Sequence, residues 1–275
     1  MERENPYKVI PAEVTEVIDE SPTIKTFHLK PEKPIPFKTG QFIEFSVPGI
    51  GEAPFTPSSS HYVVDEMDVT IMKVGFVTEH IHRVKPGDIV GLRGPFGSCY
   101  PLEKFKGKDV LIMGGGVGMA PTRSLFLTLL HDIDQYNSVT FLAGARTPED
   151  MIYKYQIEEW RKHEKVKVLR SVDSVPEGQS WDEEVCLVTK LLEKIDIKPD
   201  GNPVVVCGPP IMMKFATMDL LKYGYSPEDI YLSMEKKMYC GIGQCRHCVM
   251  GKYFVCKDGP VFTYEMIKNE ENIWE

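Results

Sequence analysis

The sequence predicts an N-terminal antiparallel β-barrel, then a doubly wound parallel α/β sheet, then a small cysteine-rich segment. Three observations predict it. Short apolar segments separated by Pro and Gly fill residues 1–105, strand and helix patterns alternate over residues 106–225, and four of the seven cysteines fall within residues 226–275. A chain of 275 residues is long enough for two compact domains and a smaller third one.

Residues 1–105 contain six apolar segments of strand length and few helix-length apolar stripes. The expected strands are Tyr7–Ile18, Ile24–Leu29, Gln41–Val47, Ser60–Val64, Met67–Val74 and Asp88–Arg93. Turn residues separate them at the spacing typical of a small antiparallel barrel. One short helix, Thr78–Val84, is expected to interrupt the strands.

From Lys108 onward the pattern changes to alternating strands and helices. The expected strands are Val110–Met113, Val139–Ala143, Lys165–Leu169 and Pro203–Cys207. The expected helices are Thr122–Leu130, Tyr153–Lys162, Val188–Ile195 and Ile211–Tyr223. Alternation of this kind predicts a parallel sheet covered by helices on both faces.

Composition and charge exclude several classes of function. A net charge of −8 without any Lys/Arg-rich run argues against nucleic acid as a partner. The first residues lack the apolar stretch of a signal peptide, and no later window resembles a membrane span, so we expect a cytoplasmic protein with reduced thiols. Cys99, Cys186 and Cys207 are dispersed and odd in number, which argues against a disulfide framework.

The cysteines near the C-terminus have the spacing of metal ligands. They are Cys240, Cys245, Cys248 and Cys256. Their C-x4-C-x2-C start is typical of plant-type [2Fe–2S] sites, in which thiolates hold both irons. Gly241, Gly243 and Gly251 allow the tight turns that such convergence requires. A structural zinc site is the alternative, although zinc prefers two short Cys pairs and Cys256 stands alone.

A glycine-rich turn follows the first strand of the second domain and predicts a dinucleotide site. It reads Gly114-Gly-Gly-Val-Gly-Met-Ala-Pro121, with Met119 where the strict fingerprint has its last glycine. Glycines there let backbone amides approach a pyrophosphate at a helix N-terminus. Cys207-Gly-Pro-Pro210 ends a later strand, and ligands in such sheets lie at the carboxyl ends of strands. A plain glycine-rich turn without a ligand is the alternative.

Taken in order, these segments resemble the ferredoxin–NADP reductase superfamily, in which a flavin-binding barrel precedes a Rossmann-like nicotinamide-binding domain. The landmarks are Gly40-Gln-Phe42, Gly75-Phe-Val-Thr78, Gly94-Pro-Phe-Gly97, the Gly114–Pro121 turn, Gly144–Asp150 and Cys207–Pro210. Each is weak alone, but the ordered set is specific. The resemblance implies three parts: an FAD-binding barrel over 1–105, an NAD(P)-binding domain over 106–225 and a [2Fe–2S] segment over 226–275.

The tail narrows the resemblance further. Glu235–Cys248 and Cys256–Tyr264 look like the closing segment of two relatives, the gamma subunit of archaeal sulfhydrogenases and the electron-transfer subunit of anaerobic bacterial sulfite reductases. Gly51–Pro54 and Gly208–Met212 also fit that group, and the electron-transfer subunit of dihydroorotate dehydrogenase is a more distant relative. The match covers nearly the whole chain.

The resemblance implies a set of flavin-binding residues. They are Pro54, Phe55, Thr56, Ile71, Lys73, Gly75, Val77 and Thr78. Thr56 is expected beside the reactive N5 region of the flavin, which makes it a candidate catalytic residue. The superfamily's arginine is replaced here by Ala53, so neutralising the FAD phosphates falls to Lys73 or to a helix dipole.

The resemblance also implies a nicotinamide-binding set. Its members are Gly114, Gly115, Gly116, Gly118, Met119, Ala120, Pro121, Arg146, Asp173, Cys207, Gly208 and Pro209. Arg146 and Asp173 are expected near the adenosine ribose, where an acid favours NAD(H) over NADP(H). Cys207 is the second candidate catalytic residue, expected beside the nicotinamide ring. Its alternative role is that of a small buried apolar side chain.

The function implied is that of an electron-transfer subunit that passes electrons between NAD(P)H, FAD and a [2Fe–2S] cluster. Its expected partners are larger redox subunits of a heteromeric complex of anaerobic metabolism: a hydrogenase, a sulfite reductase or a heterodisulfide-reductase-like protein. Two alternatives remain open at this point. One is a stand-alone NAD(P)H-dependent reductase of an oxygenase system, and the other is a zinc-tailed module without catalysis.

Overall fold

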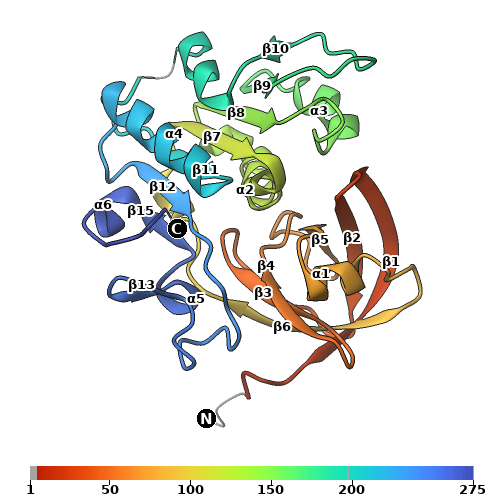
Figure 1. The fold of residues 1–275 in the computed structure, drawn as a ribbon. Helices are drawn as coiled ribbons and strands as arrows, with labels where there is room; N and C mark the ends of the chain where they lie inside the picture. Colours follow the sequence, from red (N-terminus) through yellow and green to blue (C-terminus); the bar gives the residue numbers. More distant parts are fainter. Residues whose placement is uncertain (1–4, 197, 275) are drawn as a thin grey trace.

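The computed structural model describes residues 5–196 and 198–274, which fold into two sheets joined side by side with a cysteine-rich lobe beside both (Figure 1). The lobe lies next to the outer surface of the first sheet. Among the described residues, none of the helices has both the length and the apolar character needed to span a bilayer.

The first sheet is antiparallel and has six strands in the order β4-β3-β6-β1-β2-β5. Its strands are β1 (Ile10–Ser21), β2 (Ile24–Pro31), β3 (Phe42–Val47), β4 (Gly51–Phe55), β5 (Met67–Met72) and β6 (Ile89–Phe96). Phe27, Ile43 and Phe45 fill its interior and are fully buried. Helix α1 (Phe76–Ile81) covers one opening, and the curled sheet confirms the predicted barrel.

Two details of the predicted barrel are wrong. Ser60–Val64 is not a strand: Val63 N donates to Ser60 O at 3.1 Å to close a turn, and Ser60 Oγ contacts Thr128 Oγ1 at 3.2 Å. This docking to the second sheet overrides the strand propensity of Tyr62–Val64, whose side chains are exposed. The sixth strand is β4, which the sequence did not predict because Gly51 and Pro54 are unfavourable in strands. An edge strand such as β4 tolerates both residues.

The second sheet has seven strands in the order β10-β9-β8-β7-β11-β12-β15. They are β7 (Asp109–Gly115), β8 (Ser138–Ala145), β9 (Val166–Val172), β10 (Glu184–Val185), β11 (Val204–Cys207), β12 (Ile230–Ser233) and β15 (Val261–Thr263). All pairs are parallel except β12 with β15, which confirms the predicted doubly wound sheet.

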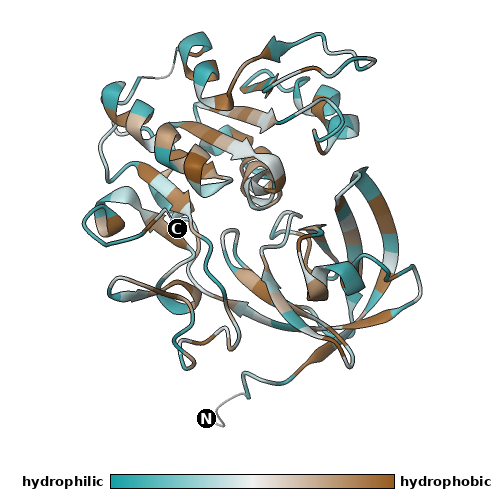
Figure 2. Ribbon diagram, in the orientation of Figure 1, coloured by the Kyte–Doolittle hydropathy of each residue, from teal (hydrophilic) through white to brown (hydrophobic). Residues whose placement is uncertain are grey.

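Helices cover both faces of this sheet. They are α2 (Met119–His131), α3 (Lys154–Trp160) and α4 (Pro210–Lys222), with the short 3-10 helices η1 (Leu102–Lys104), η2 (Gly116–Gly118), η3 (Ile133–Gln135) and η4 (Val188–Lys194). Along β7, Val110 and Ile112 pack with α2 and α3, whereas Leu111 and Met113 pack with η4 and α4. The apolar strands therefore lie between polar-faced helices (Figure 2). Residues 188–195 were expected to form an α-helix; residues 188–194 are the 3-10 helix η4 instead, and Ile195 is extended.

The sheet continues beyond residue 225 and encloses the cysteine segment. Ser233 at the end of β12 pairs with Val261 at the start of β15, and Met234 N donates to Pro260 O at 2.8 Å. The intervening residues form a loop, the hairpin β13 (Val249–Met250) and β14 (Tyr253–Phe254), and helix α5 (Val255–Asp258). Helix α6 (Tyr264–Ile267) follows β15. The cysteine loop is thus anchored at both ends on adjacent strands.

Candidate functional site

The dinucleotide turn and the Cys207 turn lie side by side, as the sequence predicts. Gly114 at the end of β7 pairs in register with Cys207 at the end of β11. In the strand order of this sheet, β7 is where the connections reverse, with β8 on one side and β11 on the other. Ligands of doubly wound sheets bind at such a switch point, beyond the carboxyl ends of the strands.

The glycines of this turn serve two different purposes. A Cβ at Gly118 would lie 2.5 Å from Cys207 O, and one at Gly114 would lie 2.7 Å from Thr122 Oγ1, so both allow close packing. Gly116 has φ +55° and nothing within 4 Å of its Cβ position, so its backbone faces open space. Met119, Ala120 and Pro121 then form the first turn of α2. This arrangement fits a backbone cradle for a pyrophosphate.

Cys207 is a buried thiol held against the base of the cysteine loop. Its Sγ donates to Ser233 O at 3.9 Å, and burial raises the pKa of the thiol to about 12. Gly208 follows it, and Met212 of α4 lies so close that a Cβ at Gly208 would be 2.6 Å from Met212 Cε. Pro209, the N-cap of α4, is exposed. Burial thus favours the neutral thiol over the nucleophilic thiolate, which is consistent with a packing role beside a nicotinamide ring.

Arg146 and Asp173, far apart in sequence, lie together at the ends of β8 and β9. Asp173 N donates to Ala145 O and Ser174 N donates to Arg146 O, both at 3.0 Å. Burial raises the pKa of the Asp173 carboxyl, and the nearby Arg146 opposes that shift. Both side chains are exposed, so both are available to a ligand on the β7–α2 side of the sheet.

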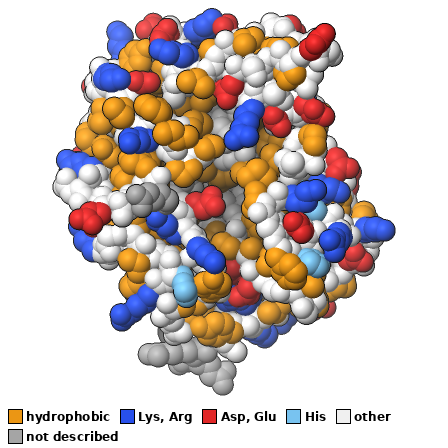
Figure 3. Space-filling model, viewed as in Figure 1, with side chains coloured by type: hydrophobic (Ala, Val, Ile, Leu, Met, Phe, Trp, Pro, Cys, Tyr) orange, Lys and Arg blue, Asp and Glu red, His pale blue; other side chains and the backbone are white. Residues whose placement is uncertain are grey.

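The flavin residues expected on β4 form a half-buried strip on the barrel edge. Pro54, Phe55 and Thr56 are partly exposed, and the Phe55 ring packs edge-on against Phe45 at 6.3 Å. Among the described residues, no hydrogen bond engages the Thr56 hydroxyl, which is therefore available. This surface of the molecule is hollowed where the barrel meets the second sheet (Figure 3). A flat apolar ring fits such a strip.

The remaining flavin residues divide into exposed and buried ones. A Cβ at Gly75 would meet nothing within 4 Å, and the neighbours Val74 and Phe76 are 70% and 65% exposed, so this segment offers an open, partly apolar surface. Ile71 is fully buried in the barrel core, which leaves only its backbone for contact. Val77 is half-buried.

Thr78 has a local structural role. Its Oγ1 accepts from Val74 N and from Gly75 N, and donates to Gly75 O, each at 2.9 Å. These bonds cap α1 and fix the Gly75 turn, so the hydroxyl is already engaged. Lys73 is exposed and lines an open cavity of about 350 Å³ together with Lys25, His82 and Arg83. Glu79 lines the same cavity and Lys25 pairs with Asp19, so among the described residues Lys73 and Arg83 are the lysine and arginine there without an ion-pair partner.

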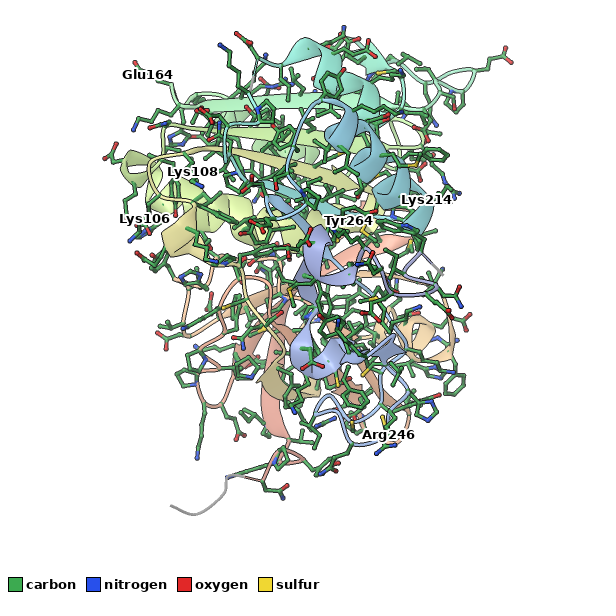
Figure 4. The ribbon with its side chains drawn as sticks, turned by 90° about the vertical axis from the view of Figure 1, so that its left-hand side faces the viewer. Lys106, Lys108, Glu164, Lys214, Arg246 and Tyr264 are labelled. Carbon is green, nitrogen blue, oxygen red and sulfur yellow. The ribbon has the colours of Figure 1, made fainter. Side chains whose placement is uncertain are left out.

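The four loop cysteines lie as two pairs. Cys248 Sγ and Cys256 Sγ are 3.2 Å apart, and the Cys245 thiol lies beside Cys240. Within the described residues, no group of three or more His, Cys, Asp or Glu side chains converges to hold a single metal ion. Cys245 is exposed, and the adjacent Arg246 lies at the outer tip of the loop (Figure 4).

Backbone N–H groups point at the sulfurs. Cys240 Sγ accepts from Cys245 N at 3.4 Å and from Ile242 N at 3.5 Å, and Cys256 Sγ accepts from Gly243 N at 3.0 Å. Although burial opposes it, these donors lower the pKa of Cys240 to about 7, whereas burial and Cys248 raise that of Cys256 to about 12. Two thiol pairs with amide donors fit a two-iron centre.

Sequence reasoning missed three charged residues under this loop. Arg93 of β6 is 2% exposed, and Glu44 of β3 is fully buried. Burial raises the pKa of Glu44 to about 8; Glu52 adds to the shift and Arg93 opposes it. Alternation along β3 places Glu44 on the outer barrel surface, which reads as solvent-exposed in a sequence. Only the fold shows that the loop covers it.

Comparisons with known families match all three parts of the chain. Residues 11–100 match the oxidoreductase FAD-binding domain, residues 112–218 match the oxidoreductase NAD-binding domain, and residues 235–268 match the iron–sulfur cluster binding domain of dihydroorotate dehydrogenase B.

Curated relatives match over nearly their whole length. Subunit gamma of sulfhydrogenase 1 from Pyrococcus furiosus is 35% identical over 273 residues, which cover 96% of this chain and 94% of the relative. A probable electron-transfer subunit of dihydroorotate dehydrogenase B from Methanocaldococcus jannaschii is 33% identical over 265 residues, covering 95% and 92%.

Solved structures share the fold. An NADH-dependent reduced ferredoxin–NADP oxidoreductase, studied for electron bifurcation, superposes with a TM-score of 0.74 at 22% identity, covering 96% of this chain and 90% of that one. A ferredoxin–NADP⁺ reductase from Neisseria gonorrhoeae with bound FAD and NADP gives 0.70 at 21% identity, covering 83% and 98%. The chain therefore belongs to the ferredoxin–NADP reductase-like flavoproteins with FAD-binding, NAD-binding and iron–sulfur domains, among the electron-transfer subunits of the sulfhydrogenase gamma and dihydroorotate dehydrogenase B type.

Proposed function

We propose that this chain is the NAD(P)H-oxidising electron-transfer subunit of a larger redox complex, with one FAD and one [2Fe–2S] cluster. The observation that carries the proposal is the placement of the cysteine loop. The loop leaves the second sheet at Ser233, returns to it at Val261, and packs on the barrel in between. Ser98 at the barrel end donates to Val261 O at 3.0 Å and accepts from Val261 N at 3.1 Å, which ties all three parts together.

The residues of this chain would hold the groups as follows. Phe55 and Thr56 would contact the flavin ring, and Gly75 with Lys73 would face its phosphates. The Gly114–Pro121 turn would cradle the nicotinamide dinucleotide, with Cys207 packed beside it. Four thiolates, paired as Cys240 with Cys245 and Cys248 with Cys256, would bind the cluster. Flavin chemistry converts the hydride pair of NAD(P)H into single electrons, which an iron–sulfur cluster carries onward.

The protein's own contribution is positioning and exclusion of water. Burial raises the pKa of Cys207, which favours its neutral thiol form beside the proposed nicotinamide site. The half-buried Thr56, which directly follows β4 on the barrel, would present its hydroxyl to the flavin. The N–H groups of Ile242, Gly243 and Cys245 stabilise negative charge on the sulfurs. This chemistry requires neither an acid–base dyad nor an activated nucleophile.

We also propose NADH as the preferred nicotinamide. Asp173 lies where a ribose diol would be recognised, and a carboxylate there repels a 2′-phosphate. Its neighbour Arg146 acts in the opposite direction, so the preference depends on the balance of the two side chains.

The acceptor is proposed to be a hydrogenase-, sulfite reductase- or heterodisulfide reductase-type subunit. Support comes from the sulfhydrogenase gamma relatives and from the exposure of Cys245 at the loop tip. A stand-alone oxygenase reductase is less well supported, because residues 235–268 match a short iron–sulfur domain and not a full ferredoxin domain.

Anaerobic purification of the untagged chain from its source tests the proposal. Flavin, iron, sulfide and zinc are measured, and co-purifying proteins are identified by mass spectrometry. We expect about one flavin and two irons per chain, together with a larger redox subunit. Zinc without iron would overturn the cluster, and a chain that purifies alone while reducing an oxygenase would overturn the partner.

A further inference from the structure

Arg93 connects the edge strand of the barrel to the cysteine loop. Its Nε donates to Glu52 Oε2 at 2.9 Å and its Nη2 donates to Glu52 Oε1 at 2.6 Å. This two-pronged pairing fixes the guanidinium plane relative to the carboxylate. Glu52 belongs to β4, the strand that ends at Phe55 and continues into Thr56. Arg93 thus binds the strand in which the expected flavin-binding residues lie.

The other side of the guanidinium faces the cysteine loop and the N-terminal segment. Nη1 donates to Pro6 O at 2.9 Å and, in a longer contact, to Cys240 O at 3.5 Å. The group lies between the rings of Phe96 and Tyr7, at 5.4 and 5.5 Å from their centroids. Tyr7 OH in turn donates to Gln244 Oε1 in the loop at 2.9 Å. One buried cation therefore has contacts in three separate segments.

The loop also packs directly on the strands beneath it. A Cβ at Gly241 would lie 3.0 Å from the Phe96 ring and 3.4 Å from Glu44 Oε1. Glu44 is fully buried, and among the described residues neither of its carboxylate oxygens has a hydrogen-bond partner. Arg93 thus pairs directly with Glu52 and acts on Glu44 only through its charge. In Figure 1 the same loop lies along the β3, β4 and β6 side of the barrel.

We propose that Arg93 is a positioning residue that sets the geometry between the flavin and the cluster without touching either one. It holds β4 through Glu52 and the first cluster cysteine through the Cys240 carbonyl, so both move as one unit. The inference rests on the proposed function, because it concerns the single-electron step from reduced flavin to oxidised cluster. No bond is made or broken in that step; one electron leaves the flavin and one arrives at the cluster.

Only an arginine can make these contacts together. Lysine has a compact ammonium group, which can pair with Glu52 but cannot present a planar fork to it while also reaching Pro6 O and Cys240 O. Arg93→Lys therefore keeps the charge over Glu44 and Glu52 and removes the geometry. This separates a positioning role from simple charge neutralisation.

Arg170 provides the matched control. It pairs with Glu183 through Nε at 2.8 Å and through Nη2, its side chain is 13% exposed, and it lies on β9, away from the cysteine loop. Arg170→Lys makes the same chemical change in a largely buried arginine–carboxylate pair, although both Arg170 nitrogens contact the same oxygen of Glu183. Any general cost of losing a buried pair of this kind appears in both variants.

The experiment uses anaerobically purified full-length protein loaded with flavin and cluster. After mixing with NADH, flavin bleaching and cluster reduction are followed separately by stopped-flow absorbance and freeze-quench EPR. The wild-type protein is measured first, so that absence of flavin, cluster or NADH reduction reports on the proposed function and not on Arg93.

For Arg93→Lys we expect unchanged flavin and iron content, flavin bleaching within about twofold of wild type, and cluster reduction slowed about tenfold or more. A shifted EPR line shape should accompany the slower step, and Arg170→Lys should change neither. Glu52→Gln, which weakens the same fork from the other side, should slow cluster reduction in the same direction. Cluster reduction at the wild-type rate in both Arg93→Lys and Glu52→Gln, with intact cofactors, would overturn the inference. So would equal slowing of bleaching and cluster reduction.

Discussion

Arg123 of α2 crosses the junction between the two sheets and places Nη1 3.1 Å from Asp68 Oδ2 on β5. The same nitrogen donates to Ser58 O at 2.8 Å, and the guanidinium lies 4.7 Å from the ring centroid of Tyr153. Tyr153 OH then donates to Thr70 on the barrel at 2.6 Å. The barrel and the nicotinamide-type domain are thus joined by a buried polar network, which fixes the two halves of the proposed hydride-transfer site.

Removing Arg123 should destabilise this junction strongly. Arg123→Met leaves Asp68 and Ser58 O partly unpaired in a buried setting, so we expect a loss of about 2–4 kcal/mol in the free energy of unfolding. Lys222→Met is the control, because its pair with Asp219 is exposed and worth at most about 0.5 kcal/mol. Urea denaturation of both variants checks this. Equal, small losses in the two would show that the network does not hold the domains together.

The barrel around Asp68 should also lose stability as the pH rises above neutrality, because Asp68 of β5 pairs with His28 of the neighbouring strand β2. The hydrogen bond to Asp68, at 2.6 Å, raises the pKa of His28 above its ordinary value of 6.5. A raised histidine pKa means that the pairing is fully present below pH 6.5 and is lost as the pH rises through the folded value.

Denaturation of wild type and His28→Gln at several pH values tests this dependence. The stability difference between them should shrink by about 0.5–1 kcal/mol from pH 6 to pH 9, a modest amount because His28 is partly exposed. A difference between wild type and His28→Gln that is constant across this range would contradict the prediction.

The two glycines of the dinucleotide turn should respond differently to alanine. At Gly118 a methyl group would meet Cys207 O at 2.5 Å, and its other near neighbours are backbone atoms of Cys207 and Gly208. We therefore expect a cost of about 1–3 kcal/mol and NADH binding weakened about tenfold or more. At Gly116 there is space, and only the φ of +55° costs about 1 kcal/mol. Calorimetric NADH binding and urea unfolding measure both. Comparable binding losses would refute the packing role of Gly118.

Replacing Asp173 should relax the choice of nicotinamide. Asp173→Asn removes the carboxylate and leaves Arg146 to attract a 2′-phosphate, so the ratio of kcat/KM for NADPH to that for NADH should rise about tenfold. Steady-state reduction of an artificial acceptor gives this ratio. Asp182→Asn, an exposed change further along the chain, should leave it unaltered. An unchanged ratio in Asp173→Asn would mean that the ribose is recognised elsewhere.

Local patterns in the sequence were sufficient to predict the glycine turn, the Cys207 turn and the cysteine loop. The glycine turn, the Cys207 turn and the cysteine spacing each act through a few neighbouring residues, and the structure brings the first two together at Gly114 and Cys207. The barrel and the parallel sheet could be predicted from hydrophobic periodicity, because periodicity is also a pattern of neighbouring residues.

Features that depend on distant packing could not be predicted. Ser60–Val64 has strand propensity but docks on α2 through Ser60 and Thr128. Glu44 occupies an outward strand position and is covered only because the chain returns more than a hundred residues later. The return of β15 to β12 is likewise a long-range pairing, which no local pattern marks.

The central claim is tested most directly by anaerobic titration of the loaded protein with NADH, followed by absorbance and EPR on the same samples. We expect the flavin bands to bleach and a reduced-cluster EPR signal to appear, and Cys256→Ser to abolish or alter that signal while Cys99→Ser leaves it intact. A flavin that bleaches with no reducible iron signal in the wild-type protein, or a signal indifferent to Cys256, would contradict the account.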